Sequence, residues 1–152
     1  MTNEELKAKV LAIVPNAAFE EGKQYPEVTV AQNKVHPLIK ALKEDADTSL
    51  DYLWCLSGVD YGDSLGVVYH LESVKHRHML VIKTKTMNLE SPTLDSVCDI
   101  FQTAEFHERE VYDLFGISFK NHPDLRRIFL EEDWIGYPLR KNYKDDINIV
   151  ER

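Results

Sequence analysis

Apolar residues recur at helical spacing near the start of the chain. Over residues 2–14 they fall on one helix face, and Thr2 followed by Glu5 is the capping-box pattern of a helix N-terminus. A second helix is expected over 37–44, because Pro37 suits the first helical position and an apolar face follows it. The first part of the chain is therefore predicted to hold two amphipathic helices.

The middle of the chain changes to a period of two. Residues 50–57 and 67–72 alternate between two sets of side chains, which predicts two strands joined as a hairpin around Gly62. A third strand is expected over 78–85, and a short one around Val28. Because neighbouring strands with short connections pair antiparallel, the sheet is expected to be mostly antiparallel.

Two further helices are expected after these strands. Residues 91–101 return to helical spacing, and Ser91-Pro92 is typical of a helix start. The next helix is predicted to end at Gly116, since glycine tolerates the positive φ that commonly follows a helix. This order of elements predicts an α+β fold with helices on one face of the sheet.

The C-terminal segment has no regular period. From Asn121 onward it mixes prolines, paired arginines and large apolar residues, a composition that argues against a solvated tail. We therefore divide the chain into an α+β body, residues 1–119, and an extended arm, residues 120–152, that is expected to pack on a partner protein. Trp134 and Arg140 are residue types that dominate interface energetics. The alternative, an arm that folds back onto its own body, stays open.

Composition and charge narrow the classes of function. The chain has 152 residues, 43% of them hydrophobic and 29% charged, as expected for one globular domain. Its net charge of -8 lies in the body, where 19 acidic residues oppose 11 basic ones, whereas the arm has seven of each. An acidic body is a poor match for nucleic acid or anionic lipid. No apolar run approaches the ~20 residues that span a bilayer, and the polar N-terminus is unlike a signal peptide, so a cytoplasmic location is expected.

Motifs for cofactors and metals are missing from the sequence. Cys55 and Cys98 lack neighbours at the spacings of zinc or iron–sulfur sites, and the six glycines form no nucleotide-binding loop. His76 and His78 alone make a weak metal site. The stretch 105–113 combines histidine with several carboxylates, but it has no Glu-x-x-His pair, so a charged helix face is favoured over a metal or acid–base site.

That charged helix face is expected to hold the start of the arm. We hypothesise that Arg109, Glu110 and Asp113 pair with Arg126 or Arg127 and hold the start of the arm on the body. His122 is expected to serve in packing or hydrogen bonding where the chain meets another protein.

The same region carries a family resemblance. Its matched positions are Glu108-Arg109-Glu110, Asp113-Leu114-Phe115, His122, Arg126, Ile128 and Phe129, followed by Asp133-Trp134, Gly136 and Pro138-Leu139-Arg140-Lys141. In identity and spacing they resemble the signature of the C subunit, the 30 kDa-type subunit of complex I, NADH:quinone oxidoreductase (NDH-1). The family signature and predicted interface together comprise Glu108, Arg109, Glu110, Asp113, His122, Arg126, Arg127, Trp134, Pro138 and Arg140.

This resemblance implies a two-layer fold with a mixed sheet and a role inside a larger assembly. It implies a non-redox structural subunit in the peripheral arm of the proton-translocating complex, which braces the large quinone-site subunit (the D subunit) and lies beside iron–sulfur subunits. FMN, iron–sulfur clusters and quinone would bind in partner subunits, and this chain would hold no cofactor, metal or catalytic site of its own. The chain would be peripheral on the cytoplasmic side of the bacterial inner membrane and would contact it only through the complex.

Two alternatives stay beside this interpretation. Complex I-like membrane-bound hydrogenases and ferredoxin-dependent complexes carry a similar subunit, and the chain has no feature that separates them. A free-standing enzyme built on the carboxylates and histidine of 105–113 is disfavoured, because no cofactor motif accompanies them.

Overall fold

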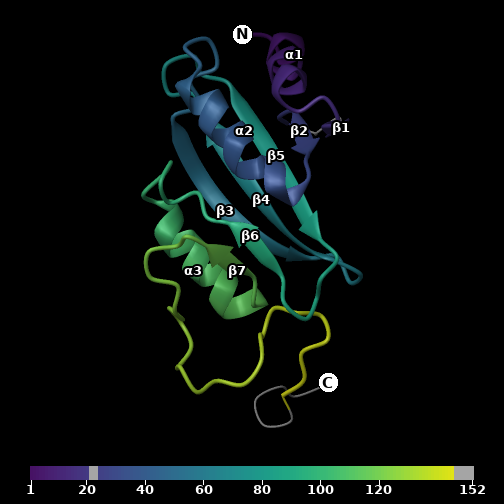
Figure 1. The fold of residues 1–152 in the computed structure, drawn as a ribbon, viewed down its shortest axis with the longest axis vertical. Coiled ribbons are helices and arrows are strands. Elements are labelled where there is room, and N and C mark those ends of the chain that lie inside the picture. The colour runs from purple at the N-terminus through teal and green to yellow at the C-terminus, as the bar shows by residue number, and fades with distance from the viewer. Residues whose placement is uncertain (21–23, 146–152) are drawn as a thin grey trace.

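The structure, a computed structural model, describes residues 1–20 and 24–145. Within these ranges the chain forms three α-helices and seven β-strands (Figure 1). In chain order they are α1 (Asn3–Ile13), β1 (Ala18–Glu20), β2 (Glu27–Thr29), α2 (Gln32–Glu44), β3 (Tyr52–Asp60), β4 (Leu65–Glu72), β5 (Met79–Thr86), β6 (Thr93–Asp95), α3 (Ala104–Phe115) and β7 (Ser118–Lys120). None of the described helices has both the length and the apolar character needed to cross a bilayer.

Five of the strands form one mixed sheet in the order β1-β2-β5-β4-β3. β2 and β5 run parallel, and the other neighbouring pairs are antiparallel. β6 and β7 pair in parallel as a separate two-stranded sheet. The predicted α+β fold with a mixed, mostly antiparallel sheet is therefore confirmed.

The β3–β4 hairpin contains a bulge that sequence alternation did not indicate. Leu53 lies opposite Leu71, and the register shifts before Cys55 pairs with His70, so Trp54 is the extra residue. A bulge of this kind reverses the side to which later residues point. As a result Leu53 and Leu56, three positions apart, are both buried in the core.

The first helix forms as its capping box predicts. The Glu5 N–H donates to Thr2 Oγ1 at 3.2 Å, and the Thr2 N–H donates to Glu5 Oε2 at 2.8 Å. Leu6 and Val10, one turn apart, are buried in the core. The reciprocal cap satisfies two N–H groups that the first turn cannot pair internally.

The second helix begins earlier than predicted. α2 starts at Gln32, so the expected start at Pro37 is wrong, and the proline lies inside the helix. The preceding Ala31 makes no side-chain cap hydrogen bond, and the sequence therefore carries no start signal there. Burial of the first turn through Val35 extends the helix, and its buried stripe faces one side of the sheet (Figure 1): Val35, Leu38, Ile39 and Leu42.

The helix predicted over 91–101 is wrong. Its first residues form β6 instead, with Leu94 opposite Phe119 of β7. The N–H of Ser96 donates to the carbonyl of Lys120 at 2.9 Å, which is a contact to a distant segment. Tertiary pairing thus satisfies backbone groups that a helix would have paired locally.

The third helix packs against the sheet at its β3 edge. Gly58 lies on the same side of β3 as the buried Leu56. A Cβ added at Gly58 would lie 2.5 Å from the Phe115 ring, so only glycine leaves room for α3 at this distance. Both α2 and α3 therefore pack on the same side of the sheet, as predicted.

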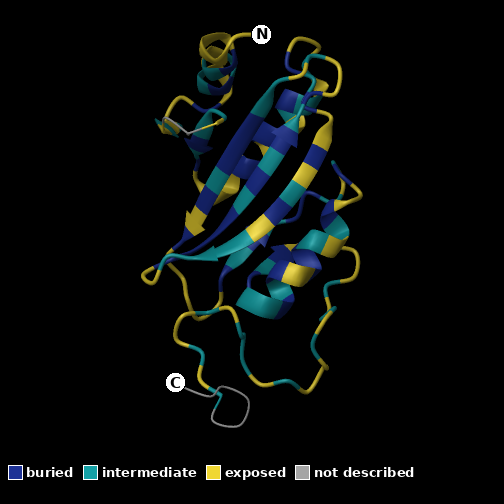
Figure 2. Cartoon of the chain, turned by 180° about the vertical axis from the view of Figure 1, so that it is seen from behind, coloured by how far each residue is buried: buried dark blue, intermediate teal, exposed yellow. Residues whose placement is uncertain are grey.

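The opposite side of the sheet carries no helix in the described part of the chain. Figure 2 looks onto this side and shows exposed and half-buried residues alternating with buried ones along the strands. The rings of Tyr52 and Trp54 are exposed there and meet edge to face, with their centroids 5.7 Å apart. We refer to this surface of β3, β4 and β5 as the open face.

The arm begins within β7, which spans the predicted boundary after residue 119. Residues 121–145 form neither helix nor strand, as the absence of periodicity indicated. Figure 1 shows this segment leaving the α3–β7 region, passing below α3 and turning back under the body. The predicted arm also included 146–152, which lie outside the described residues.

Candidate functional site

The site centres on the end of α3, where the arm contacts the body. Gly116 follows the helix with φ 71° and ψ 26°, and its N–H donates to the carbonyl of Tyr112 at 2.9 Å. The predicted glycine stop is thus confirmed. The ring of Tyr137 also packs directly on Gly116, where a Cβ would lie 2.5 Å from the ring. Glycine is required here both for the left-handed turn and for the close approach of the arm.

Asp113 is the main anchor for the arm. Its carboxylate is fully buried, and Oδ2 accepts the N–H groups of Ile128, Phe129 and Leu130 at 3.1, 2.7 and 3.0 Å. Burial works to raise the pKa of Asp113. The three N–H donors and Arg127 outweigh it and hold the pKa below its ordinary value. A single charged oxygen therefore orders three consecutive residues of the arm.

Arg127 binds the second carboxylate oxygen of Asp113 and also binds backbone groups further along the arm. Its Nη1 donates to Asp113 Oδ1 at 2.8 Å, in an ion pair whose side chains are 12% and 0% exposed. Its Nη2 donates to the carbonyls of Trp134 and Gly136 at 3.0 and 3.1 Å. The guanidinium carbon lies 5.3 Å from the centroid of the Tyr137 ring, within range of a cation–π contact. One buried cation thus joins α3 to three arm residues.

Arg109 holds the start of the arm through backbone groups. Its Nε donates to the carbonyl of Arg126 at 3.1 Å, and its Nη2 to the carbonyl of Arg127 at 3.0 Å. The hypothesis of helix–arm ion pairs is confirmed for Asp113 with Arg127. Arg126 instead pairs with Asp124 at 2.8 Å on the surface, and Glu110 is exposed.

The far end of the described arm has anchors that the sequence did not indicate. Arg140 Nε donates to the carbonyl of Phe115 at 2.6 Å, and Nη1 donates to the carbonyl of Leu89 at 2.9 Å. The Lys141 N–H donates to Asp60 Oδ2 at 2.8 Å and lowers the pKa of Asp60. These partners come from three distant segments, so no local spacing could have identified them.

A second buried carboxylate, Glu108, lies on the same helix but binds the body. Its Oε1 accepts the Val97 N–H at 2.8 Å, and Oε2 accepts Ser96 Oγ at 2.6 Å and Cys98 Sγ at 3.3 Å. Burial raises the pKa of Glu108 above its ordinary value, although these three hydrogen bonds and the nearby His122, whose Nε2 lies 4.0 Å from Oε2, act to lower it. Glu108 therefore stabilises the turn after β6, which the sequence predicted to be helical.

His122 completes a group of three ligand-type side chains. His122 Nε2, Glu108 and Cys98 Sγ offer atoms that all lie within 4.8 Å of one another. Each atom already has a protein partner, since His122 Nδ1 accepts the Asp124 N–H at 3.0 Å and Nε2 faces the Glu105 carbonyl at 3.0 Å. His122 thus makes hydrogen bonds within its own chain, and its predicted place at a contact with another protein stays a prediction. The expectation that this chain holds no metal or cofactor stays a prediction.

The arm exposes three large apolar side chains to solvent, among charged residues such as Glu131 and Glu132. Phe129, Ile135 and Leu139 are 66%, 89% and 52% exposed, although their neighbours in sequence bind the body. Trp134 is half-buried, and its Nε1 has no acceptor within the described ranges. We call the three exposed side chains the apolar surface of the arm.

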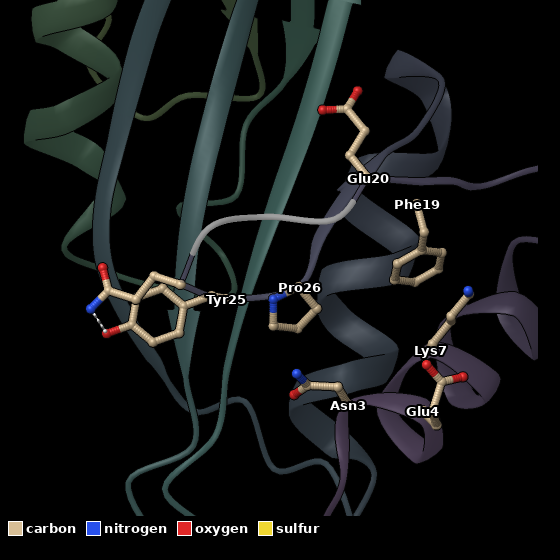
Figure 3. A pocket seen from close by; sticks show the side chains of 8 residues that line it. Asn3, Glu4, Lys7, Phe19, Glu20, Tyr25 and Pro26 are labelled. Carbon is tan, nitrogen blue, oxygen red and sulfur yellow. Dashed lines mark hydrogen bonds between the residues drawn. The ribbon is translucent and has the colours of Figure 1, made fainter.

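A separate hollow of about 370 Å³ is lined by residues of α1, by Phe19 and Glu20 of β1 and by residues 24–26 (Figure 3). Lys7 lies over the Phe19 ring, 5.5 Å from its centroid, on one side of the hollow. Gln24 donates to the Tyr25 hydroxyl at 3.0 Å on the other side. The hollow shares no lining residue with the arm or its anchors.

Comparison with known protein families places most of the chain in one of them. The model of the family described as the 30 kDa subunit of respiratory-chain NADH dehydrogenase matches residues 28–147. The hollow beside α1 is lined by residues that precede this match. The arm anchors and the described part of the arm lie inside it.

Individual relatives agree with the family match. The chain is 48% identical over 122 residues to the C/D subunit of NADH-quinone oxidoreductase from Phocaeicola vulgatus, covering 80% of this chain and 23% of the relative. It is 51% identical over 105 residues to the C subunit of the same enzyme from Chloroherpeton thalassium, covering 68% of this chain and 43% of the relative. The C subunit from Chlorobium phaeobacteroides is 41% identical over 132 residues, which cover 84% of this chain and 79% of that one. The chain thus spans less than half the length of the first two relatives.

One solved structure extends the likeness to the fold. A chain in the structure of the membrane-bound sulfane sulfur reductase, an archaeal respiratory membrane complex, superposes with a TM-score of 0.73. It is 26% identical in sequence, and the match covers 93% of this chain and 85% of the other.

Proposed function

The chain belongs to the family of the 30 kDa subunit of respiratory-chain NADH dehydrogenase, and from this premise we propose that it is a structural C subunit without a redox centre. In this proposal it braces the large quinone-site subunit, the D subunit, in the peripheral arm of a proton-translocating NADH:quinone oxidoreductase. The chain contributes no catalytic site of its own. It lies peripherally on the cytoplasmic side of the bacterial inner membrane.

The observation that carries this proposal is the contrast between the two sides of the arm. The side toward the body is held by a buried ion pair and by backbone hydrogen bonds to Asp113 and Arg109. The other side exposes Phe129, Ile135 and Leu139 to solvent. Exposing large apolar side chains on an ordered segment is unfavourable unless a partner covers them. The arm is therefore arranged as a preformed docking surface.

The D subunit is the proposed partner because some relatives are single chains named as combined C/D subunits. The relatives from Phocaeicola vulgatus and Bacteroides fragilis are named as C/D subunits, and this chain matches 23% and 20% of their lengths. Two proteins that can be joined in one polypeptide must tolerate lying next to each other in the assembly. Neighbouring iron–sulfur subunits are proposed as further contacts.

In this proposal the chain fixes the relative positions of its partner subunits and takes no part in electron transfer itself. Electrons would pass from NADH through FMN and iron–sulfur clusters to quinone, all in partner subunits. Such reactions depend on the relative placement of their reacting groups, and small displacements reduce rates strongly. An arm that is itself rigidly anchored can hold a partner in place.

Purification of the complex from the source membranes tests the proposal. The chain would carry an N-terminal tag, and Ile135→Asp with Phe129→Asp would be compared with the wild type. The matched control is Met87→Asp, because Met87 is an apolar residue 71% exposed outside the arm. We expect the D subunit and NADH:quinone activity to co-purify with the wild type and the control, and to be lost with the double variant. Equal recovery of the D subunit with all three chains would contradict the docking surface.

A second candidate function is the equivalent subunit of a complex I-like assembly with another electron donor, such as a membrane-bound hydrogenase or a ferredoxin-dependent complex. The likeness to a chain of the membrane-bound sulfane sulfur reductase keeps this candidate in view. The brace would be the same in both cases. An assay of the purified complex with NADH, hydrogen and reduced ferredoxin distinguishes the two candidate functions, because the complex reduces its electron acceptor only with the donor that it uses.

A further inference from the structure

The open face of the sheet brings a thiol and an imidazole together. Cys55 of β3 lies directly opposite His70 of β4, and Cys55 Sγ is 3.3 Å from His70 Nδ1. Both side chains are partly exposed, and the neighbouring Ser57 and Trp54 are exposed. The bulge at Trp54 produces this pairing, because it turns Cys55 away from the core.

The other cysteine is half-buried as well, but it faces a carboxyl group in place of an imidazole. Cys98 Sγ donates to Glu108 Oε2 of α3 at 3.3 Å. Burial raises the pKa of Cys98 to about 12, and the nearby Glu108 contributes in the same direction. Since the thiolate is the reactive form of cysteine, Cys98 is expected to be inert at neutral pH. The chain therefore contains its own unreactive reference thiol.

We propose that Cys55 is a site of reversible thiol modification by low-molecular-weight disulfides, with His70 as the general base. The imidazole Nδ1 takes the thiol proton, and Cys55 Sγ attacks one sulfur of the disulfide. A new mixed disulfide forms, the original S–S bond breaks, and the departing thiolate takes a proton from the imidazolium. The cysteine is oxidised and one half of the disulfide is reduced, so atoms and electrons balance.

The geometry supports this step at three points. The Sγ–Nδ1 distance is within hydrogen-bonding range for sulfur, which general-base assistance requires. The partly exposed position of Cys55 leaves an approach for a small disulfide. In addition, no described helix covers the open face, so that a bulky adduct does not have to displace the core. The site lies on a surface other than that of the arm and its anchors and is independent of the proposed docking on the D subunit.

Incubation of the purified full-length chain with oxidised glutathione at neutral pH tests the proposal. Peptide mass spectrometry would follow the mixed disulfide at each cysteine over time. We expect the adduct to form at Cys55 and be removed by a reducing agent, while Cys98 remains unmodified. Cys55→Ser should abolish the adduct, and Cys98→Ser should leave its rate unchanged.

The role of His70 is tested by His70→Asn, which keeps a hydrogen-bond acceptor near Sγ but removes the base. We expect the rate of adduct formation to fall about 100-fold, at the lower end of general-base contributions. His36→Asn, at a histidine bound to Asp99 elsewhere on the surface, is the matched control and should react like the wild type. Circular dichroism would verify that both variants fold. Equal reaction at Cys55 and Cys98, or an unchanged rate in folded His70→Asn, would overturn the proposal.

Discussion

The body buries apolar side chains against one another, whereas the arm is attached through charged and polar groups. In the body, Ile82, Leu38 and Val10 are fully buried in one continuous core. In the arm, order depends on Asp113 and Arg127, which together bind five other arm residues through backbone groups. Apolar burial is non-directional and tolerates small shifts, while hydrogen bonds to a buried charge hold one geometry. The difference explains how a segment without helix or strand can still present a defined surface.

The largest effect on stability is expected from a truncation in the core of the body. Ile82→Ala removes a fully buried side chain from the middle of the sheet and should lower the free energy of unfolding by about 2–5 kcal/mol. The arm should be lost in the same transition, because its anchors lie on α3, which packs on this sheet. Urea unfolding followed by circular dichroism measures the change. Met87→Ala, at an exposed position, should stay within about 0.5 kcal/mol of the wild type.

The next largest effect separates the arm from the body. Asp113→Asn leaves Arg127 largely buried without its anion and should cost about 3 kcal/mol, mostly as local unfolding of the arm. Limited proteolysis should then cut within 121–145 while the body remains resistant. The control is Glu110→Gln, which removes an exposed carboxylate from the same helix. Unchanged protease resistance in Asp113→Asn would show that the arm does not depend on this anchor.

A smaller effect is expected at the other buried carboxylate of α3. Burial raises the pKa of Glu108, so folding disfavours its charged form. Glu108→Gln removes that charge and keeps a carbonyl acceptor, so it should cost about 1 kcal/mol or less. Thermal unfolding of the purified chain gives the comparison with Asp113→Asn. A loss in Glu108→Gln as large as that in Asp113→Asn would mean that the charged form of Glu108 stabilises the fold.

The two carboxylates should also differ in their dependence on pH. The pKa of Asp113 lies below its ordinary 3.8 in the folded chain, so its stabilisation is present above pH 3.8 and is lost as pH falls through the folded pKa. The pKa of Glu108 lies above its ordinary 4.5, so its stabilisation is full below pH 4.5 and is lost as pH rises through the folded pKa. We therefore expect that the free energy of unfolding of Asp113→Asn falls less steeply than that of the wild type as the pH is lowered through the acid range. For Glu108→Gln, the free energy of unfolding should fall less than that of the wild type as the pH is raised from acid to neutral.

The smallest effect on the isolated chain is expected at the apolar surface of the arm. Ile135→Ser changes a side chain that is 89% exposed, and the free energy of unfolding should shift by less than about 0.5 kcal/mol. Binding to the D subunit should nevertheless weaken, by about 2 kcal/mol if Ile135 lies at the centre of the contact. Calorimetry of the chain and co-purification of the complex give the two measurements. A large loss of stability without loss of binding would assign Ile135 to the fold of the arm.

Sequence patterns predicted the regular elements unevenly. α1, α3 and the hairpin were predicted well, because the capping box at Thr2, the glycine stop at Gly116 and strand alternation are local signals. The start of α2 was missed because Ala31 makes no cap, and its first turn depends on burial against the sheet. The helix predicted over 91–101 does not form, although its apolar residues have helical spacing. Its backbone groups instead bind β7 and the Glu108 side chain.

Within the candidate site, residue types were predictable but their partners were mostly not. The pairing of Asp113 with Arg127 was one of the helix–arm pairings hypothesised from residues of the family signature, which left Arg126 and Arg127 open as partners. The roles of Asp60 and the carbonyl of Leu89 were not anticipated, since each lies far along the chain from the group it binds. The contact of Ser96 with Glu108 was missed because Ser96 was placed in a predicted helix.

By itself the sequence determined the fold class, the C-terminal end of α3 and the family, because these depend on residue identities at fixed local spacings. Only the tertiary structure decided that the pKa of Asp113 is lowered, that the pKa of Glu108 is raised and that Cys55 meets His70. The protonation of a buried carboxylate depends on which donors surround it, and contact across strands depends on register and bulges. Both are set by segments that meet only when the chain folds.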